Sequence, residues 1–297
     1  MGLVPAGSAE RFVEVDGGRV RVLESTATPT TVWGRSPLLL IHGGGFDNAG
    51  ISWFEVFGAL GADRPVVAFD LPGFGATEGL APLGGATEMA EFVVRIGRRL
   101  DVSRAVLMGV SMGGDVALNV ALRHPSFVEA LVLIAPGGLV PVFRNRFVQL
   151  SAWLAAQLPD RVMLPLARLA NTRVESALEA MVHDSSGLPP QVVAEFVREA
   201  RRPDAGLGYL RYNQASLGPW SMRNNLLPVV HRIATPTLFF HGQDDPLVDL
   251  RGSQRASARM PAAHLVQVPE CGHWAQFEAR DRFLAEVRGF LDHRARR

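Results

Sequence analysis

The stretch Ala105-Val106-Leu107-Met108-Gly109-Val110-Ser111-Met112-Gly113-Gly114 decides the fold of this 297-residue chain. It starts as a short apolar run, which suits a strand buried on both faces, and ends in a helical pattern. Between them stands Gly-x-Ser-x-Gly, the nucleophile elbow, in which a strained strand-to-helix turn holds a serine clear of the sheet. Glycine on either side lets neighbouring backbone approach closely. Ser111 is therefore the candidate nucleophile, at a helix N-terminus that favours negative charge.

Five further runs of mostly apolar residues lie along the chain, each of a length that suits a buried strand. They occupy residues 38–41, 66–69, 131–134, 237–240 and 265–268. Helical patterns cover residues 86–100, 113–123 and 281–293. This alternation predicts an α/β fold with a mostly parallel central sheet flanked by helices. Before it, residues 12–15 and 19–23 alternate apolar and polar side chains around Asp16-Gly17-Gly18, which predicts a hairpin.

Residues 140–230 do not continue the alternation of strands and helices. They hold no comparable strand pattern, and several helix-length segments are separated by prolines. We expect a helical lid inserted between two core strands. The chain then divides into residues 1–139, the first part of the core, residues 140–230, the lid, and residues 231–297, the second part of the core.

A histidine–glycine loop, His42-Gly43-Gly44-Gly45, follows the run 38–41. Glycines at this place free a backbone N–H for the negative oxygen that develops in acyl transfer, which makes one half of an oxyanion hole. We expect the donors to be the amides of Gly44, with Gly45 its nearest rival, and of Met112. A phosphate-binding loop fits poorly, because neither a Lys-Ser/Thr pair nor a complete Gly-x-Gly-x-x-Gly is present.

Two later loops offer an acid and a base. His241-Gly242-Gln243-Asp244-Asp245-Pro246 follows the run 237–240, and Glu270-Cys271-Gly272-His273-Trp274 follows the run 265–268. A carboxylate at such a strand end reaches a histidine and holds its tautomer. Asp244, Asp245 and Asp249 are the candidates for this acid, and His273 is the candidate base.

The composition excludes several classes of protein for this chain. Hydrophobic residues make up 47% of the chain and charged residues 20%, as in a globular chain with a sizeable core. The net charge of +1 offers no broad field for nucleic acid or an anionic membrane. All 30 basic residues are arginines, which excludes lysine chemistry, and the single cysteine, Cys271, excludes an intrachain disulfide. No signal peptide, membrane span or metal-ligand spacing is recognised, so we expect a cytoplasmic protein that needs no metal or other cofactor.

Together these strings resemble the α/β-hydrolase superfamily over nearly the whole chain. Within it, the chain is most similar to the meta-cleavage-product hydrolases and to their esterase and cofactor-free haloperoxidase relatives. The resemblance rests on residues 40–45, 69–75, 109–114 and 271–274. The order serine, acid, histidine is that of this superfamily. Its Gly-x-x-Asp loop assigns the acid to Asp245, and leaves Asp244 to the turn and Asp249 to the start of the next helix.

The resemblance also implies residues that bind substrate. Gly43 and Gly45 belong to the oxyanion loop, and Trp274 matches the residue that follows the base in the carbon–carbon hydrolases. Those enzymes carry Asn before the nucleophile, where this chain has Val110. They also carry a lid arginine for the substrate's carboxylate, and Arg198 lies near its expected place.

We therefore expect hydrolysis of an ester-type bond in a small, partly apolar molecule. The alternative is carbon–carbon cleavage of a dienoate keto acid, with Arg198 binding the carboxylate. A third alternative is a non-catalytic receptor of the same fold. The resemblance also raises the expectation of a homodimer. Apolar lid residues either line an acyl pocket or attach the lid to the core; they are Phe143, Phe147, Trp153, Leu158 and Met163.

Overall fold

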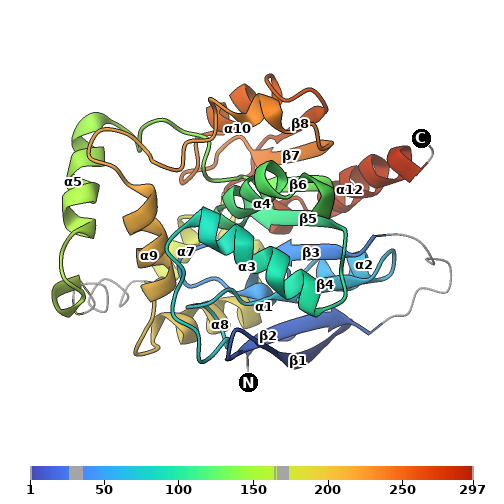
Figure 1. Cartoon of the computed structure of the whole chain (residues 1–297), viewed down its shortest axis with the longest axis horizontal. Coiled ribbons are helices and arrows are strands. Elements are labelled where there is room, and N and C mark those ends of the chain that lie inside the picture. Colours follow the sequence, from blue (N-terminus) through green and yellow to red (C-terminus); the bar gives the residue numbers. More distant parts are fainter. Residues whose placement is uncertain (1, 27–35, 164, 166–173, 296–297) are drawn as a thin grey trace.

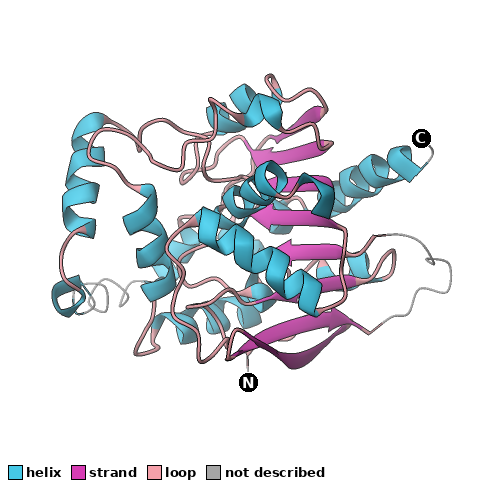
Figure 2. Ribbon diagram, in the orientation of Figure 1, coloured by secondary structure: helices cyan, strands magenta, loops and turns pink. Residues whose placement is uncertain are grey.

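The computed structural model of the chain describes residues 2–26, 36–163, 165 and 174–295. In this part of the chain, eight strands form one sheet in the order β1-β2-β4-β3-β5-β6-β7-β8. β1 pairs antiparallel with β2 and β2 with β4, and all other neighbours are parallel. Helices cover both faces (Figures 1 and 2). The α/β fold and the mostly parallel sheet are thus confirmed.

The strands lie where the apolar runs predict them. Their bounds are Ser8–Val15 (β1), Gly18–Ser25 (β2), Leu38–Ile41 (β3), Val66–Phe69 (β4), Ala105–Val110 (β5), Val128–Ile134 (β6), Thr237–Gly242 (β7) and Ala263–Val268 (β8). The predicted hairpin is β1–β2. Its two-residue loop, Asp16 and Gly17, has φ of 53° and 84°, and two positive φ values match the twist of a tight hairpin.

The hydrophobic core lies on both faces of the sheet. Leu39 and Ile41 of β3 belong to the core cluster on one face, which also holds residues of α3 (Ala86–Arg99), α4 (Met112–Arg123) and α10 (Leu250–Ser257). Leu38 and Leu40 point the other way and pack with a second group of helices. These are α1 (Ala49–Ser52), α2 (Phe57–Gly61), α11 (Ala275–Glu278) and α12 (Arg280–Ala295). Burial on both faces explains why the parallel strands read as unbroken apolar runs.

The region predicted as the lid is helical. Among the described residues between β6 and β7 lie the helices α5 (Arg146–Ala156), α7 (Val174–Glu179), α8 (Pro190–Ala200) and α9 (Leu207–Ser216). None of the strands of the sheet falls among the described residues of 140–230. Figure 1 shows α5 and α9 beyond one end of the sheet. The division of the chain at residues 139 and 230 stays a prediction. Nowhere in the described residues is a helix both long and apolar enough to cross a membrane.

Candidate active site

Ser111 stands in a strained turn between β5 and α4. Its φ of 54° and ψ of −117° are rare for a residue with a side chain. Neighbouring backbone fixes the turn on both sides. The N–H of Ser111 donates to the carbonyl of Ile134 (2.9 Å), and the carbonyl of Ser111 accepts from the N–H of Gly137 (2.8 Å). A strained backbone persists where its surroundings fix it, and such places are often functional.

The two glycines of the elbow are needed for close backbone approach. A Cβ on Gly109 would lie 2.2 Å from the carbonyl oxygen of Gly113. A Cβ on Gly113 would lie 2.3 Å from the carbonyl oxygen of Ile41, at the end of β3. The elbow therefore packs directly against the start of the histidine–glycine loop, as the motif predicts.

The amides of the histidine–glycine loop have different partners. The N–H of Gly43 donates to Oδ2 of Asp47 (2.9 Å) and to the hydroxyl of Ser52 (3.2 Å). Across the described residues, no acceptor is found for the amides of Gly44 and Met112. This pattern fits the expectation that Gly44 and Met112, rather than Gly43, hold an oxyanion. Their role stays a prediction.

Two buried side chains brace this loop. Asp47 accepts from Ser52 Oγ at 2.5 Å, and burial raises the pKa of its carboxyl. His42 accepts the N–H of Leu71 on Nε2 (3.0 Å), which leaves Nδ1 to donate to the carbonyl of Gly43 (2.7 Å). Asp47 was not among the site residues predicted from the sequence, where its one signal is an acid five positions after the histidine.

Asp245 and His273 meet across the ends of β7 and β8. Nδ1 of His273 lies 2.7 Å from Oδ2 of Asp245, and both side chains are buried. Oδ1 of Asp245 accepts the N–H groups of Leu247 (2.8 Å) and Val248 (2.9 Å). Burial alone favours the neutral acid, but hydrogen bonds from His241 and His273 outweigh it, and the pKa of Asp245 is well below its ordinary value. The pair is thus a carboxylate that orients an imidazole.

The other two candidate acids, Asp244 and Asp249, contact other groups. Asp249 is the N-cap of α10, and its Oδ1 accepts the N–H of Arg251 at 2.9 Å. Asp244 is half-exposed and pairs with His183, 3.2 Å away. Of the three candidate acids, the geometry brings Asp245 to the histidine.

The loop of His273 is fixed by its backbone. The N–H of His273 donates to the carbonyl of Met181 (2.8 Å), and the N–H of Gly272 donates to the carboxylate of Glu278 (3.0 Å). Burial, as the largest cause, raises the pKa of the Cys271 thiol to about 12. Thiolate chemistry at Cys271 is disfavoured, which fits its expected role as a packed small residue.

Comparison with known proteins places these features in a family. The family model described as alpha/beta hydrolase fold matches residues 36–280. The chain belongs to the α/β hydrolase fold family. It is 26% identical to a 2-hydroxy-6-oxononadienedioate/2-hydroxy-6-oxononatrienedioate hydrolase from Pseudomonas sp, over 98% of this chain and 99% of that protein. It is 28% identical to the dihydrolipoyllysine-residue acetyltransferase component of the acetoin cleaving system of Pseudomonas putida, over 96% and 70%.

The fold is similar to that of a bacterial membrane phospholipase A, described as a virulence factor. The TM-score is 0.77, with 26% identity over 97% of this chain and 87% of that one. The resemblance to hydrolases, including the meta-cleavage-product type, is thus confirmed, and the chain is an α/β-fold hydrolase.

The residues expected to bind substrate in this hydrolase differ in their surroundings. The side chain of Val110 is fully buried in the core. Trp274 is buried beside His273 and meets Phe196 of α8 edge to face, with ring centroids 5.9 Å apart. Phe196 in turn meets Phe46 (5.7 Å), so an aromatic row joins α8 to the histidine–glycine loop. Roles for Val110 and Trp274 in binding stay predictions.

Arg198 of this α/β hydrolase is already engaged by carboxylates. Its guanidinium donates to Glu195 (2.7 and 2.8 Å) and to Glu199 (2.6 Å). Both glutamates are buried, and Glu195 also accepts the N–H of Leu3. All three residues lie on α8, so the positive charge of Arg198 is compensated within its own helix, and Glu195 links that helix to Leu3.

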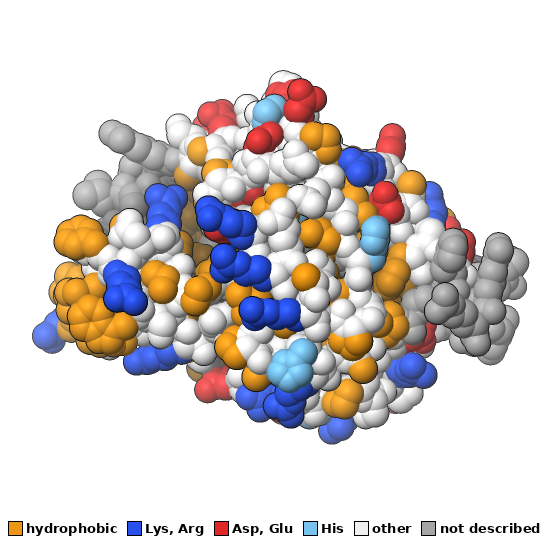
Figure 3. Space-filling view, turned by 90° about the horizontal axis from the view of Figure 1, so that it is seen from above, with side chains coloured by type: hydrophobic (Ala, Val, Ile, Leu, Met, Phe, Trp, Pro, Cys, Tyr) orange, Lys and Arg blue, Asp and Glu red, His pale blue; other side chains and the backbone are white. Residues whose placement is uncertain are grey.

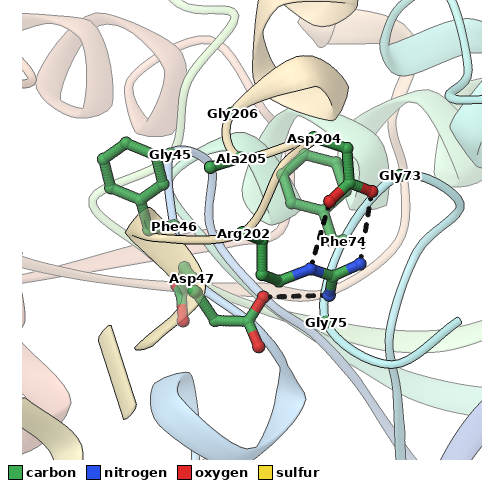
Figure 4. Close-up of a pocket in the computed structure, with 11 residues that line it drawn as sticks. Gly45, Phe46, Asp47, Gly73, Phe74, Gly75, Arg202, Asp204, Ala205 and Gly206 are labelled. Carbon is green, nitrogen blue, oxygen red and sulfur yellow. Dashed lines mark hydrogen bonds and ion pairs between the residues drawn. The ribbon is translucent and has the colours of Figure 1, made fainter. Parts of the chain in front are cut away.

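A small depression lies beside the histidine–glycine loop. Its lining includes Gly45, Phe46, Asp47, the turn 73–75 and residues 204–206. Figure 4 shows the Arg202 guanidinium here, with dashed lines to Asp204 and to a second carboxylate, that of Glu199 at 3.1 Å. This arginine is also neutralised. Among the described residues, no cluster of three or more His, Cys, Asp or Glu could hold a metal ion.

Three of the five apolar residues on and near α5 are exposed. Phe147 is 80% exposed, and Phe143 and Leu158 are also exposed. Figure 3 shows hydrophobic side chains gathered at the end of the molecule where α5 lies. For Phe147, neither a pocket nor attachment of lid to core is right, because its ring faces solvent.

Proposed function

We propose that the chain cleaves an ester-type bond of a small, partly apolar molecule through Ser111, His273 and Asp245. His273 takes the proton of the Ser111 hydroxyl as its oxygen attacks the carbonyl carbon. Asp245 orients the imidazole and stabilises the imidazolium. The amides of Gly44 and Met112 hold the oxyanion, and removing one such donor costs about 2.7–4 kcal/mol of barrier. His273 gives this proton to the departing alcohol, which leaves an acyl-enzyme, and the neutral histidine then activates the water that hydrolyses it.

The observation that carries this proposal is the buried hydrogen bond between Asp245 and His273 at 2.7 Å. It fixes the proton on Nδ1 and leaves Nε2 as the base. The strained turn at Ser111 supports it, as does the pair of unpartnered amides. The similar phospholipase supports an ester-type substrate.

Carbon–carbon cleavage of a dienoate keto acid is the second candidate. It is favoured by the relative named as an oxononadienedioate hydrolase, which matches over nearly its whole length. Two observations on this chain favour the ester instead. Arg198, expected to bind the substrate's carboxylate, is paired with Glu195 and Glu199. Val110 stands where the carbon–carbon hydrolases are expected to have Asn.

A fluorophosphonate probe and a panel of substrates test the proposal. The probe is expected to modify Ser111 in the folded wild type and to leave Ser111→Ala unmodified. Chromogenic esters of graded acyl length are expected to turn over, with Ser111→Ala inactive. No adduct on folded wild-type protein would overturn both enzymatic candidates and favour a non-catalytic receptor.

The same panel separates the two reactions. A dienoate keto acid is run beside the esters, on wild type and on Arg198→Gln. Turnover of this acid faster than of every ester, with a large rise in KM for Arg198→Gln, would establish carbon–carbon cleavage and overturn the ester proposal. Ester turnover that Arg198→Gln leaves unchanged supports the ester proposal.

A further inference from the structure

The chain has two tyrosines, and they lie one turn apart on α9. Tyr209 and Tyr212 stack with ring centroids 5.8 Å apart and planes inclined by 12°. One ring reaches the helix that follows the nucleophile, and the other reaches the histidine–glycine loop. The tyrosine pair thus links two parts of the proposed catalytic machinery through a helix of the predicted lid.

At one end of the pair lies Asp115, four residues after Ser111. Its carboxyl group has no exposure to solvent. Oδ2 accepts from the hydroxyl of Tyr212 (2.8 Å) and from Nδ2 of Asn224 (2.7 Å), and Oδ1 accepts from Nδ2 of Asn119 (3.0 Å). Asn224 also donates to the hydroxyl of Tyr212 (3.0 Å), which closes the network.

Neutral groups alone satisfy this carboxylate. In the described part of the chain, no arginine or histidine forms an ion pair with Asp115. Burial raises its pKa to about 6, although all three hydrogen bonds lower it. A buried acid without a cation costs stability. The mechanism proposed above gives this carboxyl group no role.

At the other end, the ring of Tyr209 lies against Gly44. A Cβ added to Gly44 would be 2.3 Å from Cε2 of this ring and 2.4 Å from Cδ2. The side chain is 37% exposed, so part of the ring stays open. Gly208, the preceding residue, packs as closely on Phe74, which itself meets the His42 ring edge to face. A carbonyl group held by the Gly44 amide would therefore lie beside Tyr209.

We propose that Tyr209 is a specificity-determining residue that contacts the substrate next to the oxyanion loop, and that Asp115 is a positioning residue that holds Tyr209 there through Tyr212. This inference rests on the ester hydrolysis proposed for Ser111. It gives a role to the buried carboxylate of Asp115, which costs stability. Through Tyr212, this carboxylate places the ring of Tyr209, about one helical turn away on the predicted lid. Another polar link of α9, the ion pair from Arg211 to Asp160, lies at the surface, where ion pairs contribute little.

Selectivity between esters tests the role of Tyr209. The measured quantity is the ratio of kcat/KM for two p-nitrophenyl esters, the acetate and the hexanoate. Tyr209→Ala is expected to change this ratio about 10-fold or more, the size of a lost apolar contact with substrate. Tyr209→Phe, which keeps the ring, is expected to leave the ratio within about twofold. An unchanged ratio in Tyr209→Ala would overturn the assignment.

A double-mutant cycle tests whether Tyr212 and Asp115 act through Tyr209. Tyr212→Phe and Asp115→Asn are each expected to shift the ratio in the direction of Tyr209→Ala, by about threefold or more. Combined with Tyr209→Ala, Tyr212→Phe is expected to add no further shift, because residues that act through one contact are not additive. Additive shifts would overturn the positioning role. So would a lower Tm with no change in the ratio, which marks a merely structural role.

Fluorine NMR supplies a readout that needs no turnover. Protein labelled with 3-fluorotyrosine carries its labels at two positions only, and Tyr209→Phe assigns them. Asp115→Asn is expected to move both resonances, whereas the control Asp160→Asn leaves Tyr209 in place. A Tyr209 resonance that Asp115→Asn does not move would overturn the positioning role, even in a protein without esterase activity. Wild-type protein that neither turns over esters nor reacts with the fluorophosphonate contradicts the proposed function instead.

Discussion

Nε2 of His241 lies 3.2 Å from Oδ2 of Asp245, the oxygen that also meets Nδ1 of His273 at 2.7 Å. His241 is fully buried, and its Nδ1 lies 2.8 Å from the hydroxyl of Ser253. Two imidazoles thus converge on one carboxylate oxygen. Because a serine hydroxyl can donate to Nδ1, Nε2 is left as a donor, which the carbonyl of Val248 (3.1 Å) and Asp245 share. His241 therefore helps to keep the acid ionised and in place.

Replacing His241 is expected to weaken catalysis without abolishing it. His241→Ala removes one hydrogen bond to a charged group, worth about 1.5–3 kcal/mol, which predicts a fall in kcat of about 10- to 100-fold. His241→Gln, whose amide reaches a similar place, is expected to restore most of the loss. Steady-state kinetics on an active ester, with Tm as a check on folding, measure both variants. Equal rates in wild type and a folded His241→Ala would refute this role.

Substitutions of the three acids after β7 are expected to differ sharply in their effect on kcat. Asp245→Asn keeps the shape but removes the charge that fixes the His273 tautomer, and kcat is expected to fall by about 10⁴-fold. Asp249→Asn and Asp244→Asn change acids outside this pair and are expected to leave kcat within about twofold. Burst titration of active sites followed by kcat measurement checks all three. A large loss in Asp244→Asn with an active Asp245→Asn would move the acid to Asp244.

The sequence predicted what depends on local pattern. The strand runs, the hairpin and the turn at Ser111 follow from the spacing of apolar residues and glycines, and the structure confirms them. The pairing of Asp245 with His273 also follows the predicted order of loops. These features can be predicted because each sequence pattern that indicates them is short and local.

Features that depend on distant segments were missed. Nothing near Asp115 in sequence indicates that Tyr212 and Asn224 will meet it, since 97 and 109 residues separate them. The pairing of Arg198 with Glu195 and Glu199 was also missed, although these acids are only three positions and one position away on α8. Phe147 was expected either to line a pocket or to attach the lid to the core, whereas its side chain on α5 is exposed. Side-chain partners across the fold are set by packing that one sequence does not display.

The elbow glycine Gly113 should be intolerant of a methyl group although it lies in a helix. Alanine has the higher helix propensity, but its Cβ would lie 2.3 Å from the carbonyl oxygen of Ile41 and 2.5 Å from that of His42. Backbone at this distance has to move, and Gly113→Ala is expected to cost about 3 kcal/mol of stability. The control is Gly289 in α12, where an added Cβ meets no atom of the described residues within 4 Å.

Gly289→Ala is expected to gain up to about 1 kcal/mol from helix propensity. Urea unfolding of both variants measures the difference. A Gly113→Ala protein as stable as wild type would mean that the elbow and the end of β3 are not in the contact described above.

The buried carboxyl of Asp115 should make stability fall as the pH rises. Burial raises its pKa from 3.8 to about 6 in the folded protein. Between these values the folded state binds a proton that the unfolded state has lost, so the free energy of unfolding decreases with pH. Two pKa units correspond to about 3 kcal/mol, lost between about pH 4 and pH 6.

Asp115→Asn removes this slope, because an amide does not titrate. The free energy of unfolding of Asp115→Asn minus that of wild type is therefore expected to rise by about 3 kcal/mol from pH 4 to pH 7 and then to level off. Urea titrations at several pH values measure the difference, in which the other titrating groups cancel. A difference that stays flat over this range would show that Asp115 titrates normally, and a difference that falls would show that a cation stabilises its charge. If Asp115 does titrate near pH 6, the protein keeps at neutral pH a charge that lowers its own stability, which is the trade-off expected of a carboxylate retained to position Tyr209.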